Sequence, residues 1–180
     1  MNRVLDFWGK YMTVAYFQTM SRYNRWMNEK LFAACDAMPD ELRRADKGAF
    51  FKSVHGTLNH ILLCDRLWLR RFTHRPYSAT SLDQELYADW SELKRERTAT
   101  DDAIDAWLAS LSDDVLQAPL TFTSLSVTQE RTMPLWVLCA HLFNHQTHHR
   151  EQLTTLMEQL GYDSGATDLP LVPHAPWAFF

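Results

Sequence analysis

The stretch "PLWVLCAHLFNHQTHHREQLTTLMEQLG", residues 134–161, combines an apolar helical pattern with four of the chain's eight histidines. At about 100° per residue its leucines fall on one stripe, as expected for a helix that packs on a core. The stripe comprises Leu135, Leu138, Leu142, Leu153, Leu156 and Leu160. The histidines therefore belong to a folded helix and not to a tag or a low-complexity tract.

Three more segments share this periodicity, and glycine and proline are scarce inside them and frequent at their ends. We predict helices over residues 11–37, 48–72, 86–111 and 132–160. The weaker patch "TATDD", residues 98–102, predicts a late start or a bend in the third helix. Pro134 is tolerated in the first turn of the fourth helix, and Gly161 ends it.

The segment between the third and fourth helices has a different pattern. In "LTFTSLSVTQE" the pairs Leu120 and Phe122, then Leu125 and Val127, alternate with Ser and Thr, which predicts a short β-hairpin over residues 120–128. Residues 167–180 are too rich in proline for a helix and predict a strap that packs on the bundle or on a partner chain. We expect one all-α domain over residues 1–180, a four-helix bundle with a small hairpin between helices three and four.

Composition excludes several classes of protein. The chain has a net charge of −4 and no basic run, which argues against nucleic acid as a ligand. No apolar stretch approaches the ~20 residues that span a bilayer, and the charged N-terminus does not match a signal peptide. We therefore expect a cytoplasmic protein. Cys35, Cys64 and Cys139 lack C-x-x-C spacing, so we expect buried thiols without a disulfide framework or a thiolate zinc site.

The histidines of the fourth helix divide into two groups. His149 lies near the middle of the leucine stripe and His145 at its inner flank, whereas His141 and His148 lie roughly 100° or more from its centre. Because His145 and His149 are four residues apart, their rings sit one turn apart, the spacing by which a helix offers two imidazoles to one metal ion. The alternative is a pair of core histidines that bond to Asn144, Gln152 or a carbonyl group.

The predicted second helix can supply a third imidazole, which a stable zinc or nickel site requires. Its apolar stripe has His60 at one flank and His55 further out on the other side. A bundle interior can bring His60 against the two histidines of the fourth helix. Asp65 also falls near the stripe and needs a partner: it either orients a metal-bound imidazole or bonds an arginine or a tryptophan.

The chain resembles the DinB/YfiT-type proteins, a DNA-damage-inducible family of metal-binding four-helix bundles that is distinct from the DNA polymerase of the same name. The resemblance covers most of the chain, in the expected order. It rests on "YNRWMNEKL" in the first helix, "SVHGTLNHILLCDRLWLRRF" in the second, the hairpin, and "HLFNHQTHHREQL" in the fourth.

The resemblance implies a ligand set. Relatives bind one divalent ion, usually zinc or nickel, through a histidine in the "NH" of the second helix and two in "NHxxxHR" of the fourth. In this sequence those residues are His60, His145 and His149. Glu151 stands where relatives often have glycine, a departure that affects packing or cavity shape more than metal binding.

The resemblance also implies two classes of function. Relatives include transferases that use low-molecular-weight thiols and a thiol-dependent isomerase, so one class is a metal-dependent transferase or hydrolase with an open metal position. His141, His148 and Asp65 are candidate catalytic residues for it. The other class is a non-catalytic bundle in which the metal staples two helices and the chain serves as a stress-related interaction module. Apolar helix faces and the terminal "WAFF" predict a homodimer.

Overall fold

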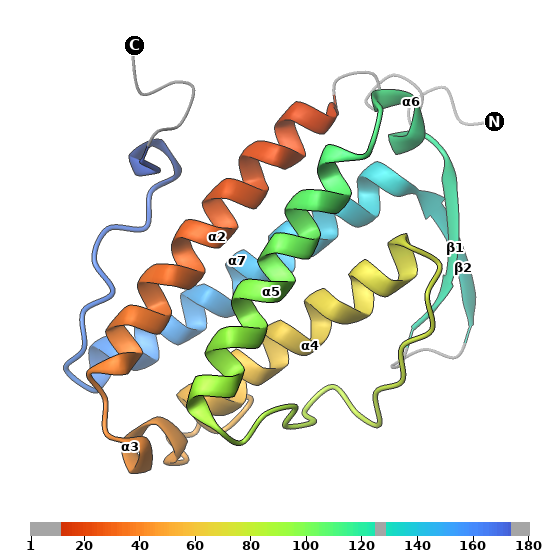
Figure 1. Ribbon diagram of the computed structural model, residues 1–180. Helices are drawn as coiled ribbons and strands as arrows, with labels where there is room; N and C mark the ends of the chain where they lie inside the picture. Colours follow the sequence, from red (N-terminus) through yellow and green to blue (C-terminus); the bar gives the residue numbers. More distant parts are fainter. Residues whose placement is uncertain (1–11, 125–128, 174–180) are drawn as a thin grey trace.

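The computed structural model describes residues 12–124 and 129–173, and in them four long helices form a bundle (Figure 1). Two short helices, a 3-10 turn and a two-stranded sheet complete the fold. The long helices are α2 (Val14–Asp36), α4 (Val54–Phe72), α5 (Trp90–Ala109) and α7 (Leu135–Gln159). The short ones are α3 (Asp40–Arg44), α6 (Asp113–Leu116) and η1 (Leu169–Leu171). The predicted four-helix bundle is confirmed, whereas the short helices were not predicted.

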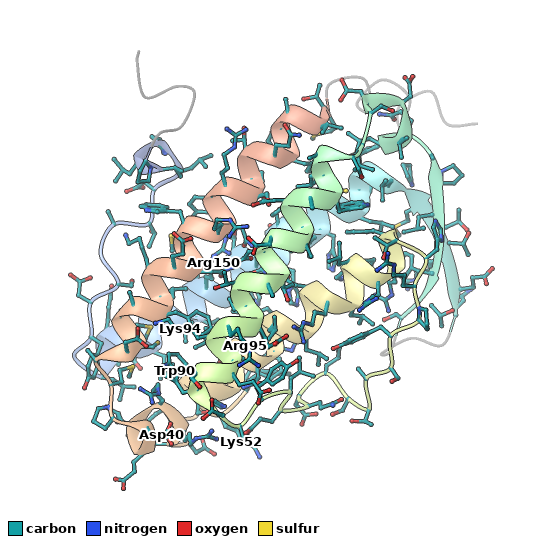
Figure 2. The ribbon with its side chains drawn as sticks, viewed as in Figure 1. Asp40, Lys52, Trp90, Lys94, Arg95 and Arg150 are labelled. Atoms are coloured by element: carbon teal, nitrogen blue, oxygen red, sulfur yellow. The ribbon has the colours of Figure 1, made fainter. Side chains whose placement is uncertain are left out.

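The bundle core has two apolar ends and a polar middle. Helix α2 packs against α5 and α7, and α4 packs against α7 and α5. One apolar cluster lies toward the hairpin and includes Phe17, Trp68 and Leu138, and a second, at the opposite end, includes Leu31 and Leu153. Buried polar side chains lie along the helices between these clusters: Asn24, Asn28, His60, Asp65, Arg97, Asp101, Gln146, His149 and Arg150. Arg150 of this layer is labelled in Figure 2. Because buried polar groups need hydrogen-bond partners, we expect these side chains to bond to one another or to a ligand at the bundle centre.

Helices α4 and α5 begin later than predicted, and in each the side chain just before the helix caps the observed first turn. Helix α4 begins at Val54 and not at residue 48, since the Ser53 hydroxyl accepts from Gly56 N at 3.0 Å and caps it. Helix α5 begins at Trp90 and not at residue 86, because Asp89 caps it. The patch at residues 98–102 lies inside α5, which is one continuous helix.

The hairpin is present, but its second strand is not the predicted one. Strand β1 (Pro119–Thr123) pairs antiparallel with β2 (Glu130–Pro134), with Leu120 opposite Met133. The prediction of a helix from residue 132 was therefore wrong, and Pro134 stands at the N-cap position of α7 instead of in its first turn. Leu125 and Val127, the expected second strand, lie outside the described residues.

The described part of the predicted C-terminal strap lies along α2 (Figure 1). The Tyr23 hydroxyl donates to the Thr167 carbonyl at 2.8 Å, and Val172 packs against Tyr23 and Met27. The terminal Trp177, Phe179 and Phe180 lie outside the described residues. None of the described helices is long and apolar enough to cross a membrane.

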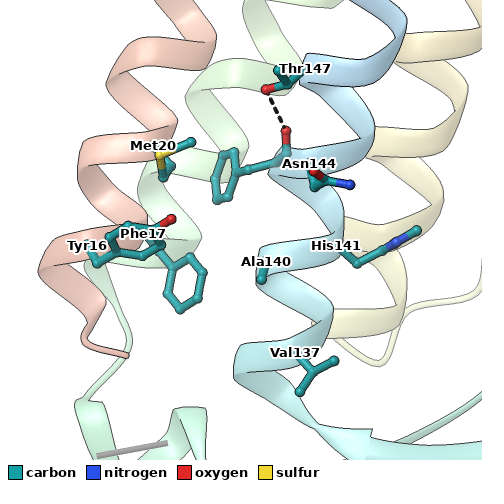
Figure 3. A pocket seen from close by; sticks show the side chains of 9 residues that line it. Tyr16, Phe17, Met20, Val137, Ala140, His141, Asn144 and Thr147 are labelled. Carbon is teal, nitrogen blue, oxygen red and sulfur yellow. Dashed lines mark hydrogen bonds between the residues drawn. The ribbon is translucent and has the colours of Figure 1, made fainter. Parts of the chain in front are cut away.

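A groove of about 470 Å³ opens between α2 and α7. Tyr16 and Phe17 of α2 and Val137 and His141 of α7 are among its lining residues. Figure 3 shows that the His141 ring leaves α7 on the side away from Tyr16 and Phe17. His141 therefore borders this groove with its backbone side and presents its ring to α4, where the other histidines gather.

Candidate metal centre

Three histidines from two helices meet in the polar layer of the bundle. His60 comes from α4, and His145 and His149 come from α7, the helix that packs beside it. Their ring centroids lie 4.4 Å apart for His145 and His149, 4.6 Å for His60 and His149, and 5.2 Å for His60 and His145. The structure thus brings together the three imidazoles that the sequence selected.

The protein determines which nitrogen carries the proton on two of these rings. His60 Nδ1 lies 2.7 Å from the Leu82 carbonyl oxygen, and His149 Nδ1 lies 2.9 Å from Gln152 Oε1. Both partners are acceptors, so each neutral ring must carry its proton on Nδ1. The two Nε2 atoms are 3.3 Å apart, and their lone pairs then face each other with no proton between them. A cation bound by both nitrogens, or a water molecule that donates to each, would satisfy both lone pairs.

The third ring has an unmatched nitrogen. His145 Nδ1 is buried and has no hydrogen-bond partner among the described residues. Burial lowers the pKa of His145 to about 3 and that of His60 to about 4, and it also lowers the pKa of His149. All three imidazoles are therefore neutral near pH 7, the state in which histidine binds a transition metal.

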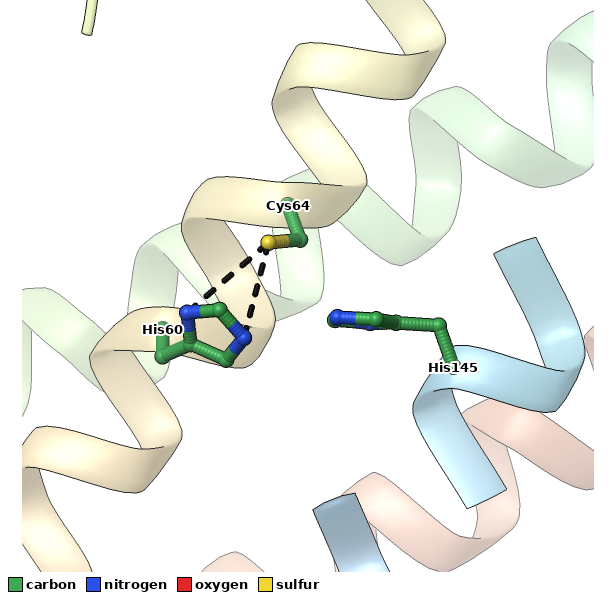
Figure 4. Close-up of side chains that lie close together, drawn as sticks. All are labelled: His60, Cys64 and His145. Atoms are coloured by element: carbon green, nitrogen blue, oxygen red, sulfur yellow. Dashed lines mark hydrogen bonds between the residues drawn. The ribbon is translucent and has the colours of Figure 1, made fainter. Parts of the chain in front are cut away.

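Cys64 borders the histidines and was not predicted as a site residue (Figure 4). Ligand atoms of His60, Cys64 and His145 all lie within 4.8 Å of one another. However, Cys64 Sγ is 3.6 Å from Nε2 and 3.8 Å from Nδ1 of His60, so it lies beside the ring and not in line with the Nε2 lone pair. Burial raises the pKa of the Cys64 thiol to about 12. The His149 ring, by contrast, faces His60 Nε2 directly, with its own Nε2 at 3.3 Å. The signal for Cys64 in the sequence was its spacing of four residues from His60, which places both side chains on the same face of the helix.

An aromatic side chain closes one side of the cluster. The Phe51 ring stacks on His60 with centroids 3.7 Å apart and meets His149 edge-on at 5.5 Å. Phe51 precedes α4 in a tight loop where Lys52 has a φ of 67°. The loop can close on the helix only because residue 56 is glycine: a Cβ there would lie 2.3 Å from the Phe51 carbonyl oxygen.

His141 and His148 are both exposed, as predicted, but their surroundings differ. The His141 ring lies 5.9 Å from the His145 ring and 5.1 Å from that of Trp68, on the α4 side of the cluster. His148 accepts from the Gln152 side-chain amide at 3.2 Å, on the outer side of α7. His141 is therefore the better placed of the two for proton transfer near the cluster.

Asp65 takes part in a buried ion network and not in the histidine cluster. Arg97 of α5 donates to Asp65 at 2.6 Å and to Asp101 at 2.7 Å, and all three side chains are at most 5% exposed. Asn28 of α2 also donates to Asp101. Of the two predicted roles for Asp65, the arginine pair is the one observed, and the network joins three helices of the bundle.

His55 is buried, and its expected position further out from the core was wrong. Its Nε2 lies 2.9 Å from the Tyr87 carbonyl oxygen, and the side chain is 1% exposed. The loop before α5 covers this side of α4 because Asn59 accepts from the amides of Leu86 and Tyr87, both at 2.9 Å. The periodicity of α4 alone did not reveal this cover.

Fold and site together define a helical bundle with a histidine cluster at its centre. A sequence profile of the DinB family matches residues 11–177, so the chain belongs to the DinB family. It is 27% identical over 153 residues to Protein DinB of Bacillus subtilis, covering 83% of this chain and 88% of that protein.

Two solved structures share the fold. A DinB-like protein from Bacillus cereus superposes with a TM-score of 0.67 at 21% identity, over 87% of this chain and 98% of that one. YfiT from Bacillus subtilis, described as a probable metal-dependent hydrolase with an unusual four-helix bundle topology, gives a TM-score of 0.57 at 18% identity. That match covers 83% of this chain and 87% of YfiT.

Proposed function

We propose that the chain is a metal-dependent hydrolase that binds one divalent ion, zinc or nickel, through His60, His145 and His149. The observation that carries the proposal is the pair of Nε2 lone pairs held 3.3 Å apart by Nδ1 bonds to Leu82 and Gln152. Oriented, neutral imidazoles suit zinc or nickel better than magnesium or calcium. The description of YfiT as a probable metal-dependent hydrolase supports the reaction class.

Each residue around the cluster has a distinct task in this proposal. When bound, a divalent ion supplies Lewis acidity, which acidifies water and polarises a carbonyl oxygen. Leu82 and Gln152 keep protons on the Nδ1 atoms, and Phe51 excludes water from one face of His60. His141 can accept a proton and return it, because its ring is exposed near the cluster and partial burial with the Arg71 charge lowers its pKa.

Metal content tests the ligand set. Elemental analysis of protein purified without a histidine tag should find one divalent ion per chain, and alanine at residue 60, 145 or 149 should remove most of it. His148→Ala is the matched control, because this neighbour on α7 is exposed. His55→Ala is a poor control, because His55 is buried against a loop. Full metal content in His149→Ala would overturn the assignment.

Activity is tested with the metal-loaded protein on chromogenic esters and amides, and separately on electrophiles mixed with small thiols. Metal-dependent hydrolysis that disappears in His149→Ala and persists in His148→Ala is the expected result. Thiol conjugation without hydrolysis would assign the chain to the thiol-dependent transferases instead. A metal-loaded protein that is inactive in both screens would favour a structural role, in which the metal links α4 to α7.

A further inference from the structure

Among the described residues, the guanidinium group of Arg71 has no carboxylate partner. Arg71, in the last turn of α4, sits over the Trp68 ring at 4.5 Å and near the Phe122 ring at 5.4 Å. It donates one hydrogen bond, from Nη2 to the Thr123 carbonyl oxygen at 2.7 Å. No acidic residue of the described chain pairs with it, although seven other arginine or lysine side chains there do form ion pairs.

The surroundings of Arg71 connect it to the cluster. The Trp68 ring lies 5.1 Å from the rings of both Phe122 and His141, and the His141 ring is 5.9 Å from that of His145. Trp68 follows His60 by eight residues on α4, which is about 12 Å along the helix axis. A cation seated on Trp68 is therefore within the length of a small molecule from the metal ligands.

The chemistry of this position favours an anion. A half-buried cation without a counter-ion is costly, and burial accordingly lowers the pKa of Arg71. Among the described residues, the bond to Thr123 uses one of the five guanidinium donors. The neighbouring rings of Phe122, which is partly buried, and His141, which is exposed, offer aromatic contact beside that charge.

We propose that Arg71 binds a carboxylate of the substrate, so that the proposed hydrolase acts on small anionic molecules whose carboxylate lies roughly 10 Å from the bond to be cleaved. Such a molecule would pass the partly buried Phe122 and the exposed His141, the rings that lie next to Trp68 between Arg71 and the histidines. This inference rests on the proposed function for the reaction, but the binding of the anion itself does not need the metal.

Binding of benzoate to the metal-free protein tests the proposal independently of activity. Benzoate pairs a carboxylate with a planar ring, and benzamide is its uncharged counterpart. The Trp68 indole N–H resonance, assigned by Trp68→Phe, reports binding in an NMR titration. Wild-type protein should prefer benzoate to benzamide by about tenfold or more, the range of a charge-assisted hydrogen bond.

Arg71→Gln should abolish this preference, and Arg71→Lys should keep part of it. Arg70→Gln is the matched control: Arg70 is the adjacent residue but is exposed and lines a different cavity, between α4 and α5. Equal binding of the two ligands by wild-type protein, no binding of either, or an equal loss in Arg70→Gln would overturn the proposal. Because the titration contains no metal, its failure is separate from failure of the metal-content test.

Discussion

Replacing Arg97 by methionine should destabilise the protein strongly, because it removes the guanidinium that bridges two buried carboxylates. Arg97 is 4% exposed and bonds Asp65, which is 0% exposed, at 2.6 Å, and Asp101, which is 5% exposed, at 2.7 Å. Methionine retains much of the side-chain volume, so the loss reports the charge and its hydrogen bonds. Breaking a buried ion pair by removing one partner costs about 3–5 kcal/mol.

The pH dependence of this loss has a defined sign. In the wild-type protein burial raises the pKa of Asp65 and Arg97 opposes that rise, so in Arg97→Met the pKa rises further above the unfolded value. The folded variant then binds more protons than the unfolded chain, and its stability falls as pH rises. The deficit relative to wild type should therefore be smaller at pH 5 than at pH 8.

Urea unfolding followed by circular dichroism measures the free energy of unfolding, with Arg95→Met as an exposed control on the same helix. For a chain of this size the expected loss corresponds to a decrease in Tm of roughly 6–20 °C. A loss below about 1 kcal/mol at pH 7, or a deficit that grows on acidification, would refute the reasoning. Asp65→Asn should leave metal content unchanged, since Asp65 pairs with Arg97 and not with a histidine.

Four further outcomes are expected. Gln152→Ala should weaken metal binding by about 10–100-fold in competition with a chromophoric chelator, because His149 loses the acceptor that orients it. Gln152→Glu keeps an acceptor and should weaken metal binding less. Gly56→Ala should lower the free energy of unfolding by roughly 1–3 kcal/mol in a urea titration, because the added Cβ meets a backbone oxygen at 2.3 Å. Metal-free protein should lose stability as pH falls below 6.5, because the folded pKa values of His145 (about 3) and His60 (about 4) lie below the unfolded value. Urea titrations at pH 7 and pH 5 measure the change, and equal stability at both would contradict it. Analytical ultracentrifugation at micromolar concentration should find the predicted homodimer, and a monomer alone would count against it.

Helical periodicity was sufficient to predict the bundle and the inward faces of its helices. The leucines at 135, 138, 142, 153 and 156 of α7 are all buried, and the histidines at 145 and 149 face α4 as their spacing indicated. The boundaries were harder to predict, because they depend on single side chains such as Ser53 and Asp89 that capture backbone amides. The second strand was missed because its pairing with β1 is not a property of either segment alone.

By itself the sequence determined the fold class, the helical faces and, through the family motif, the three histidines, because amphipathic spacing is a local property that tertiary packing preserves. Only the tertiary structure decided which groups complete the centre. Leu82 orients the His60 ring, Phe51 covers it, and Arg71 in the last turn of α4 is unpaired by any described acidic residue. Gln152, which orients His149 and lies three residues from it on the same helix, is the exception, because the sequence already offered it as a partner of the α7 histidines. The other groups come from different elements. A hydrogen bond or ring contact between elements depends on distances that only their packing sets.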